Sequence, residues 1–204
     1  SLTLERYSET KMSVGTVISQ PISDLTFIKG DPVTIGDQHN PVPVLVVEFW
    51  ATWCPPCRDS IPHLTDIQQK FQNVTILGVT YEKNSITEFV NNMGDKMNYT
   101  VAVDTNESAK NAIFTPSNAR GIPTAYILVK NKIVWQGHPM SQDFETEIQN
   151  AISQVELIVE QIALPRITES FDDLMQKPVK ELKTILEDRG ISIVGCLEKP
   201  DFAK

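Results

Sequence analysis

Residues 49–58 read Phe49-Trp50-Ala51-Thr52-Trp53-Cys54-Pro55-Pro56-Cys57-Arg58. This stretch places two of the chain's three cysteines two residues apart, behind two tryptophans and around two prolines. The spacing alone leaves three interpretations open: a redox couple, half of a metal site, or a passive disulfide. The residues on either side of the pair help to choose among them.

A strand pattern precedes the cysteine pair and a helix pattern follows it. Residues 44–50 are β-branched, aromatic and aliphatic except for Glu48, which predicts a strand buried on both faces. Residues 55–71 carry apolar side chains at helical spacing. Cys54 is therefore expected at a helix N-terminus, where unpaired N–H groups and the helix dipole stabilise a thiolate. A thiolate is the attacking species in thiol–disulfide exchange, so Cys54 is predicted to be the nucleophile.

Cys57 lies three residues after Cys54 and hence on the same helical face, one turn inward, as a resolving thiol would. Pro55 suits a first helical turn, because its missing N–H would have no intrahelical partner there. A zinc site would need two further ligands, and Cys196 and the three histidines stand in no metal-ligand spacing. A disulfide between Cys54 and Cys57 would close a ring of only four residues and constrain little of the chain, so a purely structural disulfide is disfavoured. The redox couple is favoured, and no metal or organic cofactor is expected.

Strand and helix patterns alternate along the rest of the chain. They predict strands at residues 74–80, 99–103, 126–129 and 133–135, and helices at residues 86–93, 108–113 and 144–162. This order predicts an α/β fold with a largely parallel central sheet and an antiparallel hairpin at one side. Pro165 ends the long helix, so we expect a polar arm at 1–12, a main domain at 13–164 and a small helical module at 165–204.

Composition and charge exclude several classes of protein. The chain has 204 residues and a formal net charge of −8, which argues against a protein that follows nucleic-acid phosphates. No run approaches the roughly 18 apolar residues that span a bilayer, so no membrane partner is expected. Three cysteines and no signal-peptide pattern at the start lead us to expect a reducing, cytoplasmic location.

The chain resembles the thioredoxin superfamily, and within it the TlpA-like or redoxin-type branch with its Trp-Cys-Pro-Pro-Cys signature. The likeness spans about residues 13–163 and rests on residues 47–58, Pro62, Gly121-Ile122-Pro123-Thr124, 94–104 and 133–139. It implies a thioredoxin-like fold, a central mixed sheet flanked by helices. It also implies a redox-active disulfide that exchanges with disulfides of other proteins.

The resemblance assigns roles to particular residues. Pro123 corresponds to the family's cis-proline, which lies against the cysteine pair and, with Ile122 before it, helps to bind an extended partner peptide. Glu48 corresponds to a buried acid that assists proton removal from the resolving cysteine, and its apolar neighbours independently predict burial and a raised pKa. Residues expected to shape the docking surface are Trp53, Pro55 and Pro56, whereas Trp50 is expected in the core.

Two positions depart from that branch. Many relatives have Glu two residues before the helix proline, where this chain has Ser60. Glu48 is more thioredoxin-like, since many TlpA-like sequences have Asn there. These departures favour general dithiol chemistry over a dedicated maturation step. Thioredoxin-fold couples span roughly −270 to −120 mV, so the direction of electron flow stays open.

The C-terminal residues carry two short helix patterns. Residues 171–175 form one, and the other begins with Pro178 in its first turn and ends before Gly190. With the Glu-Leu-Lys-x-Ile-Leu and Gly-Cys-x-Glu-Lys-x-Asp-Phe motifs, residues 167–204 resemble SAP-like modules. They look especially like the C-terminal domain of the ARMET, or mesencephalic astrocyte-derived neurotrophic factor, family. Because its lysines are offset by acids, a protein partner is favoured over DNA, and Cys196 is expected to be structural.

The sequence thus predicts a protein-disulfide reductase whose substrates are disulfide-containing proteins and whose electron donor it does not name. One alternative is a non-enzymatic interaction module, in which the main domain binds clients and the SAP-like tail selects their location. Another is a peroxidase, which would use a lone peroxidatic cysteine. The paired cysteines favour exchange.

Overall fold

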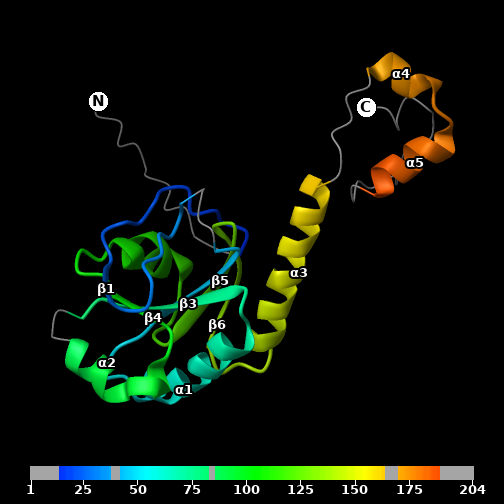
Figure 1. The fold of residues 1–204 in the computed structure, drawn as a ribbon. Coiled ribbons are helices and arrows are strands. Elements are labelled where there is room, and N and C mark those ends of the chain that lie inside the picture. Colours follow the sequence, from blue (N-terminus) through cyan, green and yellow to red (C-terminus); the bar gives the residue numbers. More distant parts are fainter. Residues whose placement is uncertain (1–13, 38–41, 83–85, 164–169, 189–204) are drawn as a thin grey trace, which may run out of the picture. The chain divides into compact units, whose positions relative to one another are not determined.

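A computed structural model of the chain describes residues 14–37, 42–82, 86–163 and 170–188 (Figure 1). The chain divides into two compact units, residues 1–155 and 156–204. The domain boundary predicted near residue 165 falls among residues 164–169, and the N-terminal arm falls within residues 1–13; both lie outside the described residues.

The first unit is built on a six-stranded sheet with the order β1-β4-β3-β2-β5-β6. Its strands are β1 (Thr26–Lys29), β2 (Val44–Phe49), β3 (Val74–Thr80), β4 (Thr100–Val103), β5 (Thr124–Val129) and β6 (Lys132–Gly137). Strands β2, β3 and β4 run parallel, whereas the pairs β1–β4, β2–β5 and β5–β6 are antiparallel. The mixed sheet is confirmed. The parallel strands β2, β3 and β4 and the antiparallel hairpin β5–β6 at one side match the expectation, whereas β1, which the sequence pattern did not reveal, adds an antiparallel strand at the other edge.

Helices and helical turns connect these strands. The described α-helices are α1 (Pro55–Lys70), α2 (Thr87–Met93), α3 (Phe144–Ala163), α4 (Phe171–Gln176) and α5 (Val179–Glu187). Shorter turns are η1 (Gly94–Met97), the π-helical η2 (Lys110–Phe114) and η3 (Thr115–Ser117). The predicted helices are confirmed to within a few residues. No described helix is both long and apolar enough to cross a membrane.

Strand β2 lies at the centre of the sheet, and all six of its residues are buried. Because side chains alternate along a strand, its two faces meet different surroundings. Leu45, Val47 and Phe49 lie in an apolar core formed with residues 18–35, η2 and β5. The other face carries Glu48, followed by fully buried Trp50, whose ring packs on Phe89 of α2 at 5.6 Å between centroids. Figure 1 shows α1 and α2 together on one side of the sheet.

The second unit includes two short helices, α4 and α5, of which α4 has a capping box. Ser170 caps α4: its hydroxyl accepts the backbone N–H of Asp173, and the Asp173 side chain accepts the Ser170 backbone N–H in return. Pro178 is the N-cap of α5, one position earlier than the first-turn place expected for it. Its Leu182 is buried. The SAP-like motif around Cys196 and the expected cap at Gly190 lie outside the described residues.

Candidate active site

The cysteine pair lies at the junction of β2 and α1. Cys54 is the N-cap of α1 in an extended conformation, and Pro55 and Pro56 occupy the first positions of the helix. The Sγ atom of Cys54 accepts the backbone N–H of Cys57 at 3.3 Å. The two cysteines form a disulfide with their Cα atoms 5.3 Å apart, and both are buried. The predicted position of Cys54 at a helix N-terminus is confirmed.

The loop that contains Ile122 and Pro123 lies against this pair. The Ile122–Pro123 peptide bond is cis, as the resemblance implied. The Cys54 Sγ lies 3.7 Å from the carbonyl oxygen of Ile122, although the two residues are 68 positions apart. Thr124 holds the loop, since its hydroxyl donates to the Gly121 carbonyl at 2.6 Å. The loop thus forms one wall of the site, next to the Cys54 sulfur.

The outer rim of the site is exposed to solvent. Trp53 is 66% exposed, which is unusual for so large an apolar side chain, and Pro55 and Pro56 are exposed beside it. Thr52 fixes the start of this rim through Glu82, whose carboxylate accepts the Thr52 backbone N–H at 2.6 Å and its hydroxyl at 2.8 Å. Exposed apolar and proline side chains around a buried disulfide suit contact with a partner surface.

The inner side of the site contains a buried acid. Glu48 lies opposite Gly78 on β3 and Ala125 on β5, so it occupies the middle of the sheet. Its carboxyl oxygens are fully buried and have no hydrogen-bond partner among the residues that the structure describes. Burial without a partner disfavours the charged form and raises the pKa of Glu48 to about 8. The expected burial and raised pKa are therefore confirmed.

Two further buried polar groups find no hydrogen-bond partner among the described residues: the indole N–H of Trp50 and the hydroxyl of Tyr99. Both lie near Gly78, where an added Cβ would meet Tyr99 Cε2 at 3.0 Å and Trp50 Nε1 at 3.1 Å. Burial raises the pKa of Tyr99 well above its usual value, and the charge of Glu48 adds to the effect. Gly78 thus leaves room for a polar cluster of Glu48, Trp50 and Tyr99.

Tyr99 and Gly78 were not predicted from the sequence as parts of the site. Gly78 pairs with Glu48 across β2 and β3, and Tyr99, which directly precedes β4, packs at Gly78 through the pairing of β3 with β4. The one available signal was the resemblance over residues 94–104, which assigned no role to Tyr99. Among the described residues, no three histidine, cysteine or acidic side chains gather closely enough to hold a metal ion.

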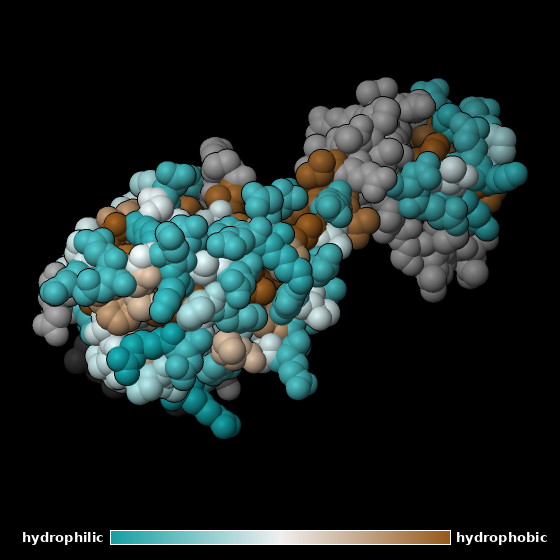
Figure 2. All heavy atoms as spheres, turned by 60° about the horizontal axis from the view of Figure 1, so that its bottom comes forward, coloured by the Kyte–Doolittle hydropathy of each residue, from teal (hydrophilic) through white to brown (hydrophobic). Residues whose placement is uncertain are grey.

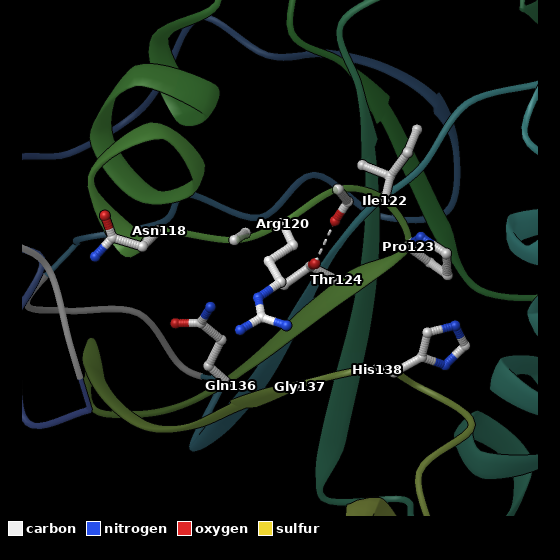
Figure 3. Close-up of a pocket in the computed structure, with 10 residues that line it drawn as sticks. Asn118, Arg120, Ile122, Pro123, Thr124, Gln136, Gly137 and His138 are labelled. Carbon is white, nitrogen blue, oxygen red and sulfur yellow. Dashed lines mark hydrogen bonds between the residues drawn. The ribbon is translucent and has the colours of Figure 1, made fainter.

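A pocket of about 570 Å³ opens beside the cis-proline loop (Figure 3). It is lined by Asn118, Ala119, Arg120, Gly121, Ile122, Pro123, Thr124, Gln136, Gly137 and His138. The Arg120 guanidinium points into the pocket toward the Gln136 side chain, and His138 lies at the Pro123 end (Figure 3). Ile122 connects the pocket to the cysteine pair, since it lines the pocket and its carbonyl oxygen lies 3.7 Å from the Cys54 Sγ.

The chain is similar to curated proteins that are named as thioredoxin-like or as thiol-disulfide oxidoreductases. The chain is 24% identical to thioredoxin-like protein YneN of Bacillus subtilis over 136 residues, which are 66% of this chain and 77% of that protein. It is 26% identical to thiol-disulfide oxidoreductase ResA of Bacillus thuringiensis over 131 residues, which are 62% of this chain and 70% of that protein.

Solved structures confirm the thioredoxin-like fold. The thioredoxin domain of a thiol-disulfide oxidoreductase from Bacteroides vulgatus aligns with a TM-score of 0.55 at 20% identity, covering 68% of this chain and 97% of that domain. StoA from Bacillus subtilis aligns with a TM-score of 0.52 at 18% identity, covering 67% of this chain and 99% of StoA.

The first unit therefore combines a thioredoxin-like fold, a Cys-X-X-Cys pair and relatives named as thiol-disulfide oxidoreductases. The sequence profile of the AhpC/TSA family matches residues 19–136, which is more than half of the chain. The chain belongs to the AhpC/TSA family.

Proposed function

We propose that this protein reduces disulfide bonds of other proteins through the Cys54–Cys57 couple. The observation that carries the proposal is the position of Cys54: it caps α1 and lies against the cis Ile122–Pro123 loop. The helix N-terminus favours its thiolate, and the loop presents a wall along which a client segment could lie. The named chemistry of the relatives supports the same assignment.

In the proposed reaction, the Cys54 thiolate attacks one sulfur of a client disulfide. A mixed disulfide forms, and the client's other sulfur leaves as a thiolate that takes up a proton. Cys57 then loses its proton and attacks the Cys54 sulfur, which breaks the mixed disulfide and releases the second client thiol. The client has gained two electrons, and the protein is left with the Cys54–Cys57 disulfide found in the structure. A donor dithiol must reduce it again.

Glu48 is the proposed acceptor of the Cys57 proton. A carboxyl group with an ordinary pKa would hold a proton too weakly near neutral pH, whereas the raised pKa of about 8 brings its affinity close to that of a thiol. Its burial also keeps the acid away from bulk solvent. The exchange would then proceed with a proton transfer inside the protein.

The test is insulin reduction by the full chain with dithiothreitol as electron donor. We expect Cys54→Ser to abolish the acceleration and Cys196→Ser, which removes the third thiol, to leave it in place. An inactive wild type, or a Cys54→Ser variant as active as the wild type, contradicts the proposal. Client binding without turnover would instead support the interaction-module alternative.

The reactivity of Cys54 gives a second test of the same proposal. In the reduced protein, alkylation by iodoacetamide against pH should report a Cys54 pKa below the free value of about 8.5, because the helix N-terminus stabilises the thiolate. A pKa at or above that value would remove the physical basis for a nucleophilic Cys54. A redox titration of the couple against glutathione then gives the direction of electron flow.

We propose further that residues 165–204 form a SAP-like module that contacts a protein and takes no part in the exchange chemistry. Its described helices, α4 and α5, correspond to the two helices expected from the sequence. Lys177 pairs with Glu181 at 2.6 Å, which offsets positive charge at the start of α5 and argues against a nucleic-acid surface. Removing residues 165–204 should leave insulin reduction within about twofold; a larger loss in a folded variant would contradict this role.

A further inference from the structure

The pocket beside the cis-proline loop differs in charge from the rest of the chain. The whole chain carries a formal net charge of −8, yet the ten residues that line the pocket include Arg120 and His138 and no acid. On the face drawn in Figure 2, the surface of the first unit is mainly hydrophilic, with apolar side chains scattered among polar ones. The pocket is therefore a site of locally positive charge on an acidic protein.

Arg120 is available to a ligand. Its side chain is exposed, and among the described residues it forms no hydrogen bond or ion pair that would occupy its guanidinium. The guanidinium points into the pocket beside the Gln136 amide (Figure 3), whose nitrogen donates to the Ser117 carbonyl at 3.5 Å. A guanidinium offers a planar set of N–H donors that matches a carboxylate.

His138 adds a second donor at the other end of the pocket. Its Nδ1 accepts the backbone N–H of Met140 at 3.1 Å, so in the neutral ring the proton is on Nε2. The pocket therefore presents donors at both ends and the backbone of Gly121 and Ile122 between them. Such a lining fits an acceptor-rich ligand.

The position of Arg120 fixes where on a client that acceptor would lie. Arg120 is two residues from Ile122, so their Cα atoms are at most about 7 Å apart. Side chains two positions apart in an extended peptide share one face and are separated by about the same distance. A client segment whose cysteine meets Cys54 beside Ile122 would thus place a side chain two positions away next to Arg120.

We propose that this pocket selects client proteins with an acidic residue two positions from the reactive cysteine, through an ion pair with Arg120. The inference rests on the proposed disulfide reduction and names the class of substrate that the site prefers. Without this local positive charge, an acidic client would meet only the repulsion of a protein of net charge −8. Arg120 therefore acts as a specificity residue at the existing site.

The test uses two peptide disulfides that differ only in Glu or Gln two positions from the cysteine. We expect the reduced full-length protein to reduce the Glu peptide about fivefold faster, which corresponds to an exposed ion pair. In Arg120→Gln this ratio should fall to about one, and in the wild type it should shrink as salt increases. The matched controls Lys132→Gln and Arg58→Gln remove exposed cations outside the pocket and should keep the ratio.

Equal rates for the two peptides in the wild type would overturn the inference while leaving the reductase proposal in place. A loss of the ratio in Arg58→Gln as well would also overturn it, since a general field would then explain the preference. If Arg120→Gln slows the reduction of glutathione disulfide but not that of the Glu peptide, the pocket binds a small anion and the peptide assignment is wrong.

Failure of the reductase proposal is recognised separately, because neither peptide would then be reduced. In that case, fluorescence anisotropy with labelled Cys→Ala peptides measures binding alone. Tighter binding of the Glu peptide by the wild type, lost in Arg120→Gln, would still support the pocket's preference. Equal binding of both peptides would overturn it.

Discussion

The side chains on the outer side of the cysteine pair are exposed to solvent, whereas those on its inner side are buried. On the outer side, Trp53 is 66% exposed and Arg120 is open to solvent beside the cis-proline loop. On the inner side, three side chains have buried polar atoms without hydrogen-bond partners among the described residues: the carboxyl oxygens of Glu48, the indole N–H of Trp50 and the hydroxyl of Tyr99. The polar groups of one side are open to solvent, and those of the other are buried.

This contrast separates two tasks of one active site. Exposed groups lose little when they exchange water for a partner, so the outer side can distinguish clients at small cost to stability. Buried polar groups without partners cost free energy, and here that cost appears as a raised proton affinity of Glu48. The outer side is thus suited to recognition and the inner side to proton transfer. Four substitutions test this division, in order of decreasing expected effect.

The largest effect is expected from Cys57→Ser, which removes the inner thiol. Turnover should fall by about 10³-fold or more, because an intramolecular attack on the mixed disulfide is replaced by attack from a second molecule. A stable mixed disulfide between Cys54 and the client should accumulate and be visible on a non-reducing gel. Cys54→Ser is the control and should form no such adduct. An adduct in neither variant would contradict the assignment of Cys54 as nucleophile.

Glu48→Gln tests the free-energy cost of the buried acid. The pKa of Glu48 is about 8 in the folded protein against 4.5 for an ordinary glutamate, so the folded state binds the proton more tightly. The stability that this proton provides is present below pH 4.5 and is lost as the pH rises toward 8. Between pH 5 and pH 7.5, the free energy of unfolding of the wild type should fall by about 3 kcal/mol relative to Glu48→Gln.

Urea unfolding of the oxidised proteins at these two pH values checks the prediction. The titration of all other groups cancels in the difference between wild type and variant, so the change with pH reports Glu48 alone. A stability difference that is the same at pH 5 and pH 7.5 would show that Glu48 titrates normally. The contrast between the two sides would then lose its electrostatic basis.

Gly78→Ala tests the packing around the buried cluster. The added Cβ would lie 3.0 Å from Tyr99 Cε2 and 3.1 Å from Trp50 Nε1, so both rings must shift. We expect a loss of about 1–2 kcal/mol in the free energy of unfolding relative to Gly121→Ala. Gly121 has no atom within 4 Å of the corresponding position, and both variants restrict the unfolded chain equally. Equal stabilities would indicate a loosely packed inner side.

The smallest effect is expected on the outer rim, from Thr52→Val. The substitution removes the hydroxyl that donates to Glu82 at 2.8 Å but keeps the shape of the side chain. Because the pair is only partly buried, the free energy of unfolding should fall by about 1 kcal/mol. Thr52→Ser retains the hydroxyl and should lie closer to the wild type in thermal and urea unfolding. A fall of about 3 kcal/mol in the free energy of unfolding, as large as the change predicted for Glu48, would contradict the assignment of Thr52 to the exposed outer side.

The sequence by itself determined the features that depend on neighbouring residues. Cys54 at the start of α1, and Cys57 one turn inward, follow from a strand pattern that changes to helical spacing at Pro55. The burial of Glu48 follows from the apolar residues on both sides of it in β2. These features lie within a few residues of one another, so local patterning is enough to predict them.

Tertiary structure alone decided which distant residues complete the site. Three features depend on strand pairing and loop positions between segments tens of residues apart. They are the edge strand β1, the packing of Tyr99 at Gly78, and the position of Arg120 in the pocket beside the cis-proline loop. Strand register and loop closure are set by packing of the whole sheet, and periodicity in one segment carries no record of its partner. The cysteine pair could therefore be predicted from its own sequence, whereas the residues packed around Glu48 and the pocket that contains Arg120 could be identified only from the fold.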